Sequence, residues 1–306
     1  MRDVPDTSIL PETLMARRLY RLDALSDPFL RDDRSRPEAV ASRAATPVEP
    51  AAATVPATAT LFGMAFRVDS AEAILRSVAA APATAPRLIT TANVDHTVVL
   101  SQDPAFRAAY AGAAVRTLDG TPLVWLARLL GARAAQRITG HDLLAAALSA
   151  APAPNDRIFL IVAEEEVGTR MRALLARIGH PASAVAVAVP PFGFEHDAAF
   201  GRTLAQRIRE HGTTLLVMGV GAPKSEVWVS RQGAALGGPV VLSVGEALNV
   251  AAGLVPRAPV LMQRIGLEWL FRFLLAPRRL FRRYFLRSWR FLAIAGREIA
   301  GAVRRR

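Results

Sequence analysis

From Leu61 onward, short apolar runs alternate with longer amphipathic stretches. The runs are RLITTAN, RIFLIVAE, AVAVAV, TLLVMGV and PVVLSVG, and a stretch with helical character follows each of them. Strands that alternate with helices form a parallel sheet covered by helices. We therefore expect an α/β fold with a Rossmann-like core. In such a sheet, ligands bind where the strands end at their carboxyl side.

Composition divides the chain into three parts. Residues 1–56 are rich in Ala, Pro, Thr and Arg, and they predict a flexible extension. Residues 57–255 hold the α/β pattern. Residues 256–306 form a C-terminal appendage, in which two helical segments bounded by prolines are expected at 260–276 and 278–303.

The net charge of +12 is concentrated in this appendage. Residues 257–306 contain thirteen arginines against Glu268 and Glu298, which is a net +11. Such a segment needs an anionic partner, and nucleic acid, acidic lipid headgroups and a phosphorylated substrate all qualify.

The second helical segment is amphipathic. On a helical wheel its arginines gather on one side and its large apolar residues on the other: Arg279, Arg283, Arg287, Arg290 and Arg297 against Phe281, Phe285, Trp289 and Leu292. This pattern predicts an interfacial helix on the anionic inner face of the membrane. The alternative is a C-terminal helix that docks on the core.

The remaining composition favours a cytoplasmic protein that is peripheral to the membrane. The chain has no cysteine, its N-terminus lacks the apolar segment of a secretory signal, and no stretch reaches about 20 uninterrupted apolar residues. The five histidines are scattered and no Asp-x-Asp pair occurs, so we expect neither a metal site nor a cofactor.

Polar residues follow two of the predicted strands. In TTANVDH, Thr91 and Asn93 stand at a strand end and suit recognition of a sugar or phosphate, although Asn93 or Asp95 could instead cap the next helix. In VRTLDGTPLVW, Asp119 could act as a general base, and an ordinary Asp-Gly turn is the alternative.

The segment VMGVGAPKSEVW predicts a phosphate-binding loop. Gly219, Gly221 and Pro223 precede Lys224, so backbone N–H groups and an ammonium would meet at one helix N-terminus. Lys224 is the only lysine of the chain. The loop fits neither GxxxxGK[ST] nor GxGxxG, which argues against an ATPase and a dinucleotide enzyme.

Several segments together resemble one family. TAN, LDGTPLVW, RITGHDLL, GAPKSEVW and PRAPVLMQRIGLEWLFRFLLAPRRLFRRY occur in the order typical of the WecG/TagA/CpsF family, glycosyltransferase family 26. The resemblance covers roughly residues 61–291. It implies a GT-E-type core with a membrane-binding appendage rich in arginine. It also implies an inverting, metal-independent enzyme that moves a hexose, N-acetylhexosamine or uronic acid from a UDP-sugar to a polyprenyl-diphosphate-linked saccharide during surface polysaccharide synthesis.

The resemblance also implies roles for individual residues. Asp119 would be the catalytic base, with Thr91 and Asn93 shaping the same site. Substrate-binding roles would fall on Arg137, Gly140, Asp142, Gly219, Gly221, Pro223, Lys224, Glu226, Gly245, Asn249, Arg257, Arg264, Arg272, Arg279 and Arg283.

The chain departs from the family pattern at three places. Ser225 follows the loop lysine where glutamine is common, and Asn249 stands where aspartate is common. Glu164, Glu165 and Glu166 replace a glycine-rich turn, so they would lie near an anionic ligand unless they point away.

Two other functions stay open. One is a relative that binds a sugar nucleotide or a lipid diphosphate without catalysis. The other is a nucleic-acid-binding protein that uses the arginine tail, although it would leave the strand-end motifs unexplained and we expect no nucleic acid partner. The sequence leaves the oligomeric state undetermined, and a homo-oligomer is one option.

Overall fold

The computed structural model describes residues 57–264, 266–281 and 289–304. The extension expected at 1–56 lies outside this part of the chain. The described residues belong to two units. One comprises 57–255 together with residues from Arg278 onward, and the other includes Pro256–Pro277. The expected appendage at 256–306 is thereby divided between the two units.

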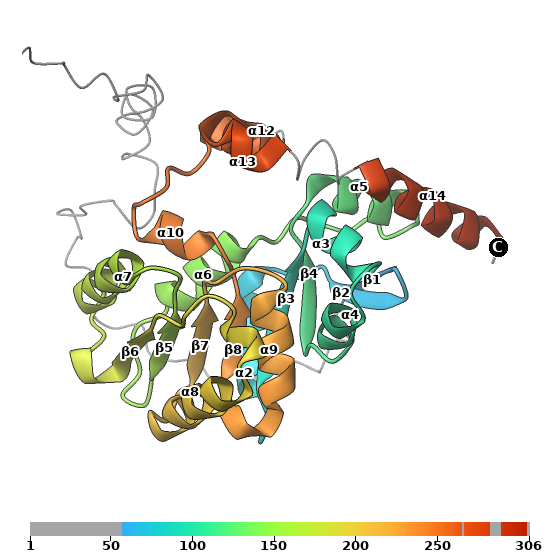
Figure 1. The fold of residues 1–306 in the computed structure, drawn as a ribbon. Coiled ribbons are helices and arrows are strands. Elements are labelled where there is room, and N and C mark those ends of the chain that lie inside the picture. Colours follow the sequence, from blue (N-terminus) through green and yellow to red (C-terminus); the bar gives the residue numbers. More distant parts are fainter. Residues whose placement is uncertain (1–56, 265, 282–288, 305–306) are drawn as a thin grey trace, which may run out of the picture. The chain divides into compact units, whose positions relative to one another are not determined.

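A six-stranded parallel sheet forms the centre of the larger unit (Figure 1). Its strands, in spatial order, are β4 (Val115–Leu118), β3 (Arg87–Ala92), β8 (Val240–Ser243), β7 (Leu215–Met218), β5 (Ile158–Ile161) and β6 (Val185–Ala188). β8 and β5 are buried along their whole length, and all their residues except Ser243 at the end of β8 are apolar. The expected parallel sheet is confirmed.

Two groups of helices cover the sheet (Figure 1). One group packs together as α2 (Ala71–Ala80), α6 (Gly140–Ser149), α10 (Ala247–Ala251) and α7 (Glu165–Arg177). The other consists of α3 (Val94–Leu100), α4 (Pro104–Ala111), α9 (Lys224–Gln232) and α8 (Ala198–Glu210). The helix α5 (Thr121–Leu129) contacts β4 at the sheet edge. Short 3₁₀ turns occur at Ala182–Ala184 (η1), Phe194–His196 (η2) and Gly233–Leu236 (η3).

An antiparallel hairpin precedes the sheet and was not expected. It pairs β1 (Thr58–Leu61) with β2 (Met64–Arg67). Phe62 and Gly63 form its two-residue turn, with φ values of 54° and 74°. Two positive φ values are those of the turn type that matches the twist of a hairpin. The sequence lacks the usual Asn-Gly signal there, which is why the pattern was missed.

The first expected C-terminal segment is two helices rather than one. α11 (Val260–Arg264) and α12 (Glu268–Leu275) are separated near Gly266, whose φ of 77° is incompatible with a right-handed helix. The second expected segment contains α13 (Pro277–Phe281) and α14 (Trp289–Arg304). Residues 282–288 between these two helices lie outside the described part.

The helix α14 docks on the larger unit. Phe291 is buried in a core cluster with residues of the hairpin, α3, α4 and α5, and Ile294, Ala295 and Ile299 pack beside it. The docking alternative is therefore confirmed for α14. The apolar face expected from the sequence does not make this contact, because Trp289 and Leu292 stay 61% and 72% exposed, and its expected role at a membrane stays a prediction.

Candidate active site

The ends of β3 and β4 bring the expected catalytic residues together. The backbone N–H groups of Asp119 and Gly120 donate to the Ala92 carbonyl at 2.8 and 3.3 Å. A Cβ atom at Gly120 would lie 3.4 Å from Asn93 Cα, so the two strand-end loops are in contact. Thr91 pairs with Thr117 in the sheet register just before these loops. Thr91, Asn93 and Asp119 thus share one corner of the carboxyl edge, as the sequence predicts.

Asn93 caps a helix. Its Oδ1 accepts a hydrogen bond from the His96 backbone N–H at 3.0 Å, and α3 begins at the next residue. The capping alternative for Asn93 is confirmed, since this bond satisfies a donor that the helix itself cannot. A contact of Asn93 with substrate stays a prediction.

A buried tyrosine and histidine support this corner, and the sequence did not reveal them. The Tyr110 hydroxyl donates to the Thr91 carbonyl at 3.0 Å and lies 2.8 Å from His96 Nδ1. Because the hydroxyl proton is used at Thr91, His96 Nδ1 must carry the proton of the second bond. Burial raises the pKa of Tyr110 well above its ordinary value, which keeps the hydroxyl protonated. No local motif marks such a pair.

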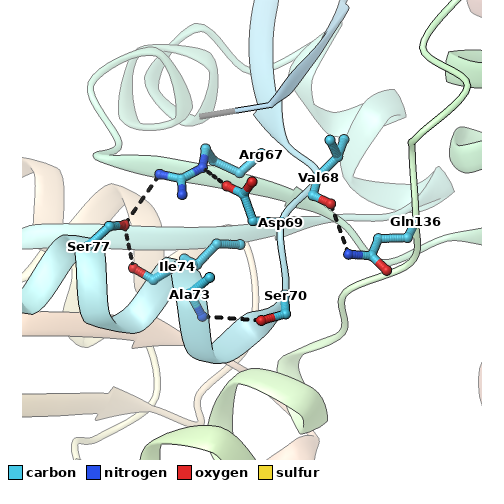
Figure 2. A network of polar contacts seen from close by, with 8 residues as sticks. All are labelled: Arg67, Val68, Asp69, Ser70, Ala73, Ile74, Ser77 and Gln136. Carbon is cyan, nitrogen blue, oxygen red and sulfur yellow. Dashed lines mark hydrogen bonds and ion pairs between the residues drawn. The ribbon is translucent and has the colours of Figure 1, made fainter. Parts of the chain in front are cut away.

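Two anchors hold the segment that contains Arg137. The Gln136 carboxamide donates to the Val68 carbonyl at 2.8 Å, as Figure 2 shows, where Val68 lies in the turn between β2 and α2. On the other side, Ile138 N–H donates to the carbonyl of Leu118, the last residue of β4, at 2.8 Å. Arg137 therefore lies on the backbone segment beside the strand end that carries Asp119.

The turn that holds Val68 is itself stabilised. Arg67 pairs with Asp69 and also donates to the Ser77 hydroxyl at 3.4 Å, while Ser70 caps α2 through the Ala73 N–H (Figure 2). The turn that receives the Gln136 hydrogen bond is thus held by contacts within itself and with α2.

Gly140 and Asp142 have structural contacts at the start of α6. The Asp142 carboxylate accepts from the N–H and the hydroxyl of Thr139, both at 2.9 Å, and forms a capping box. A Cβ atom at Gly140 would come within 3.1 Å of the Val244 backbone, so glycine is needed for packing. Substrate contacts of these two residues remain predictions.

The expected phosphate loop connects β7 to α9. Gly221 has a φ of 81° and open space around its Cα, whereas a Cβ at Gly219 would lie 2.6 Å from Leu248 Cδ1. Gly219 therefore serves packing, and Gly221 leaves the loop accessible. Pro223, joined to Ala222 by a cis peptide bond, immediately precedes α9.

Lys224 is the first residue of α9. Its Nζ lies 4.3 Å from the ring centroid of Phe192, a residue that the sequence did not indicate. Among the described residues no carboxylate pairs with Lys224. Ser225 is buried, and its N–H and hydroxyl both donate to the Gly221 carbonyl at 3.1 Å. Ser225, which stands where glutamine is common in the family, thus closes the turn of this loop through its hydrogen bonds to Gly221.

Glu226 lies beneath the loop and not on its surface. Its side chain is 1% exposed, and its Oε1 accepts a hydrogen bond from Ser243 Oγ at 2.6 Å. Burial raises the pKa of this carboxyl, which favours the neutral form.

The loop after β8 lies against the loop after β7. Gly245 has a φ of 52°, and a Cβ there would lie 3.8 Å from Gly221 Cα. Asn249 is half-buried in α10, and its carbonyl accepts the N–H of Leu254 at 2.9 Å. Gly245 is thus next to the loop of Lys224, as the sequence predicts for a shared site.

The glutamates that replace the family's glycine turn are exposed at the start of α7. Glu166 pairs with Arg170 one turn later, at 2.6 Å. Negative charge in the first turn of a helix is favourable. The position of these glutamates at the start of α7 therefore explains why they occur, and no bound ligand is needed to explain them.

The arginines of the appendage remain predicted site residues. Arg257 and Arg272 belong to the unit of Pro256–Pro277. The side chains of Arg264 and Arg279, and the whole of Arg283, lie outside the described part.

The described residues contain neither a metal-ligand cluster nor a membrane-spanning helix. Among the described residues, no three His, Asp or Glu side chains gather as ligands for a metal ion. In the same part of the chain, no helix combines the length and hydropathy of a membrane span.

The fold and the edge of this sheet define a class: a Rossmann-like α/β protein whose polar residues and glycine loops gather at the carboxyl ends of its strands. Residues 59–305 match the model of the "Glycosyl transferase WecG/TagA/CpsF family". The chain therefore belongs to this family, and the resemblance seen in the sequence is confirmed.

Two relatives have the name N-acetylglucosaminyldiphosphoundecaprenol N-acetyl-beta-D-mannosaminyltransferase. The chain is 28% identical to the one from Staphylococcus aureus over 166 residues, which is 53% of this chain and 61% of the relative. It is 26% identical to the one from Bacillus spizizenii over 191 residues, which is 62% of this chain and 72% of the relative. The similarity thus spans less than two thirds of the length of the Staphylococcus aureus relative.

Proposed function

We propose that the chain transfers a sugar from a UDP-sugar to a polyprenyl-diphosphate-linked saccharide at the inner face of the membrane. The observation that carries the proposal is the position of Asp119 at the end of β4, against the Asn93 loop and beside the segment of Arg137. Membership of the family supports the reaction class. The relatives' name supports a lipid diphosphate as the acceptor.

The reaction is a direct displacement. The acceptor hydroxyl oxygen forms a bond to the anomeric carbon, and its proton passes to the Asp119 carboxylate. The bond from the anomeric carbon to the diphosphate oxygen breaks, and UDP leaves with the electron pair. Attack from the face opposite the leaving group inverts the configuration.

The leaving diphosphate needs positive charge. In our proposal Lys224 supplies it, together with arginines of the appendage, so that no metal ion is required. Burial raises the pKa of the Glu226 carboxyl, and this direction reduces the negative charge that would oppose an anion at this loop. Gly221 and Gly245 let the backbone approach the phosphates.

The spacing of the two ends of the site suits this donor. The loops of Asp119 and Lys224 follow β4 and β7, which are three strands apart in the sheet. At a strand spacing of about 4.8 Å this amounts to about 14 Å. A sugar nucleotide in an extended conformation bridges such a distance.

The relatives' name makes an N-acetylhexosamine the first donor to test, ahead of a hexose or a uronic acid. For the membrane, the proposal relies on α14, whose Trp289 and Leu292 are exposed while Phe291 holds the helix on the core. Exposed Trp and Leu beside arginines suit an anionic headgroup region.

The test is turnover by the full-length purified chain. UDP release is measured with UDP-N-acetylmannosamine, UDP-N-acetylglucosamine, UDP-glucose or UDP-glucuronate, with and without a short-chain polyprenyl-diphosphate saccharide. We expect one donor to give turnover that depends on the acceptor and persists in EDTA. Binding of both substrates without turnover would instead support a non-catalytic relative. Salt-sensitive retention of DNA without either binding would support a nucleic-acid-binding protein.

A further inference from the structure

The helix α5 has apolar side chains on both of its sides. One side packs in the core and includes Leu123 and Leu126. On the other side, Trp125 and Leu129 are 63% and 67% exposed, and Pro122 is exposed as well. These three positions are spaced by three and four residues, so they form one stripe along the helix. A surface helix normally carries polar residues there, and an apolar stripe in water indicates a contact site.

The chain around this stripe is cationic. Arg128 and Arg133 are exposed, and Arg137 follows in the same stretch. Between Asp119 and Asp142 the sequence contains no acidic residue. Tryptophan and leucine side chains next to arginines complement the anionic headgroup region of a membrane, in both polarity and charge.

The stripe belongs to the same unit as the exposed side of α14. Both helices pack on one core cluster, which contains Phe291 of α14 and Leu126 of α5 (Figure 1). Trp289 and Leu292 of α14 are exposed as well. Each of the two helices thus presents a tryptophan and a leucine to solvent, and a bilayer is extended enough to receive both helices.

The area of the stripe is small for a contact with a second copy of the chain. A large aromatic side chain buries at most about 250 Å², so Trp125 and Leu129 together offer less than about 500 Å². A stable protein–protein interface needs about 800 Å² from each partner. Insertion at a membrane boundary has no such requirement, because each apolar side chain is buried there without a complementary partner surface.

We propose that the stripe of Pro122, Trp125 and Leu129 inserts into the headgroup boundary of an anionic membrane. This contact lies on the core, is additional to that of α14, and gives the proposed function a defined orientation. Trp125 stands six residues after Asp119, which limits the distance between them to about 20 Å. The corner that contains Asp119 is thereby held near the headgroups, where a lipid-linked diphosphate presents its saccharide.

The first experiment measures sedimentation of the full-length chain with vesicles of phosphatidylglycerol and phosphatidylcholine. We expect Trp125→Ala combined with Leu129→Ala to raise the dissociation constant for these vesicles by about 10-fold or more, because apolar burial is lost. The conservative pair, Trp125→Phe with Leu129→Ile, should keep the wild-type binding. Melting temperatures should be unchanged in both variants, since the two positions are exposed.

A second experiment tests directly whether Trp125 enters the bilayer. In a variant with Trp269→Phe and Trp289→Phe, the remaining tryptophans are Trp125 and the buried Trp228. Phosphatidylglycerol vesicles with brominated acyl chains should quench the fluorescence of Trp125, while Trp228 supplies an unquenched remainder. Addition of Trp125→Phe to this variant should abolish the quenching.

Turnover distinguishes this contact from the proposed function. The variant with Trp125→Ala and Leu129→Ala should keep the wild-type rate with a short-chain acceptor in solution. With a long-chain acceptor in vesicles, its rate should fall together with its vesicle binding. A wild-type chain that turns over neither acceptor contradicts the proposed function, whereas loss of vesicle binding and of quenching in the variants would still support the contact.

Three results would overturn the proposal. The first is vesicle binding by the alanine variant equal to that of the wild type, and the second is no quenching of Trp125 by brominated lipid. The third is a dimer in light scattering that binds no vesicles and that the alanine variant dissociates, which would show that a second copy covers the stripe.

Discussion

Ser243 donates a hydrogen bond to the Glu226 carboxyl at 2.6 Å, and this bond joins the end of β8 to the first turn of α9. Both side chains are buried, and Glu226 stands two residues after Lys224 in the first turn of α9. The pair therefore couples the fold of the sheet to the position of the predicted phosphate loop.

The first prediction concerns the stability of the protein as a function of pH. Burial raises the pKa of Glu226 above its ordinary value of about 4.5, so the folded state binds the proton more tightly than the unfolded state. The associated stability is complete below pH 4.5 and is lost as the pH rises through the folded pKa. Each unit of pKa difference corresponds to about 1.4 kcal/mol.

Glu226→Gln should remove this dependence. We expect the variant and the wild type to have similar melting temperatures near pH 4. As the pH increases, the melting temperature of the wild type should decrease relative to that of the variant. Melting curves from pH 4 to 9 measure the effect, and Glu165→Gln, at an exposed position, is the control. If the melting temperature of the wild type instead increases relative to that of Glu226→Gln as the pH rises, the carboxyl is buried as an anion.

The second prediction is that Asp119→Asn lowers kcat by about 10² or more, the usual scale of general-base catalysis. The acceptor hydroxyl gains acidity as its bond to the sugar forms, so the carboxylate helps mainly in the transition state and KM should change less. Steady-state kinetics with both substrates measure this, and calorimetry should show UDP binding intact.

Asp197→Asn is the matched control for Asp119→Asn. Asp197 lies in the connection from β6 to α8, directly after η2, and its carboxylate caps α8 by accepting from the N–H groups of Ala199 and Phe200 at 2.9 Å. Asparagine caps equally well, so this variant should keep the wild-type rate. If Asp119→Asn also keeps the wild-type kcat, Asp119 is an ordinary turn residue.

The third prediction concerns the docking of α14. Phe291 is 7% exposed and its neighbour Leu292 is 72% exposed, so the two positions separate the two faces of one helix. Phe→Ala in a core costs about 3–5 kcal/mol. Phe291→Ala should therefore speed amide exchange in α14 and in α3, on which it packs, whereas Leu292→Ala should not. Hydrogen-exchange mass spectrometry measures both, and equal effects would disprove the docking.

The fourth prediction concerns the exposed face of the same helix. Combined Trp289→Ala and Leu292→Ala should weaken binding to vesicles that contain anionic lipid, because these side chains bury apolar area at the headgroup boundary. The melting temperature should stay unchanged, since both residues are exposed. Vesicle sedimentation measures the binding, with neutral vesicles as the control. If the double variant binds the vesicles as well as the wild type does, the membrane contact lies elsewhere in the chain.

Much of this architecture follows from local sequence. The runs that end in Ala92, Leu118 and Met218 are strands, and the residues after them stand at one edge because parallel strands share their direction. The positions of Asp119 and Lys224 at that edge could therefore be predicted from the chain alone. The hairpin at Phe62 and Gly63 was missed, because its turn adopts positive φ values without the residues that usually signal them.

The sequence by itself determined the parallel sheet, the strand ends and the family, because buried apolar runs and short motifs are properties of neighbouring residues. Tertiary structure decided the rest. Contacts between Phe192 and Lys224, or between Glu226 and Ser243, depend on how separate loops fold over the sheet. The face by which α14 packs also depended on tertiary structure. The helix has apolar residues on more than one side, and only the core cluster that receives Phe291 determines which side is buried.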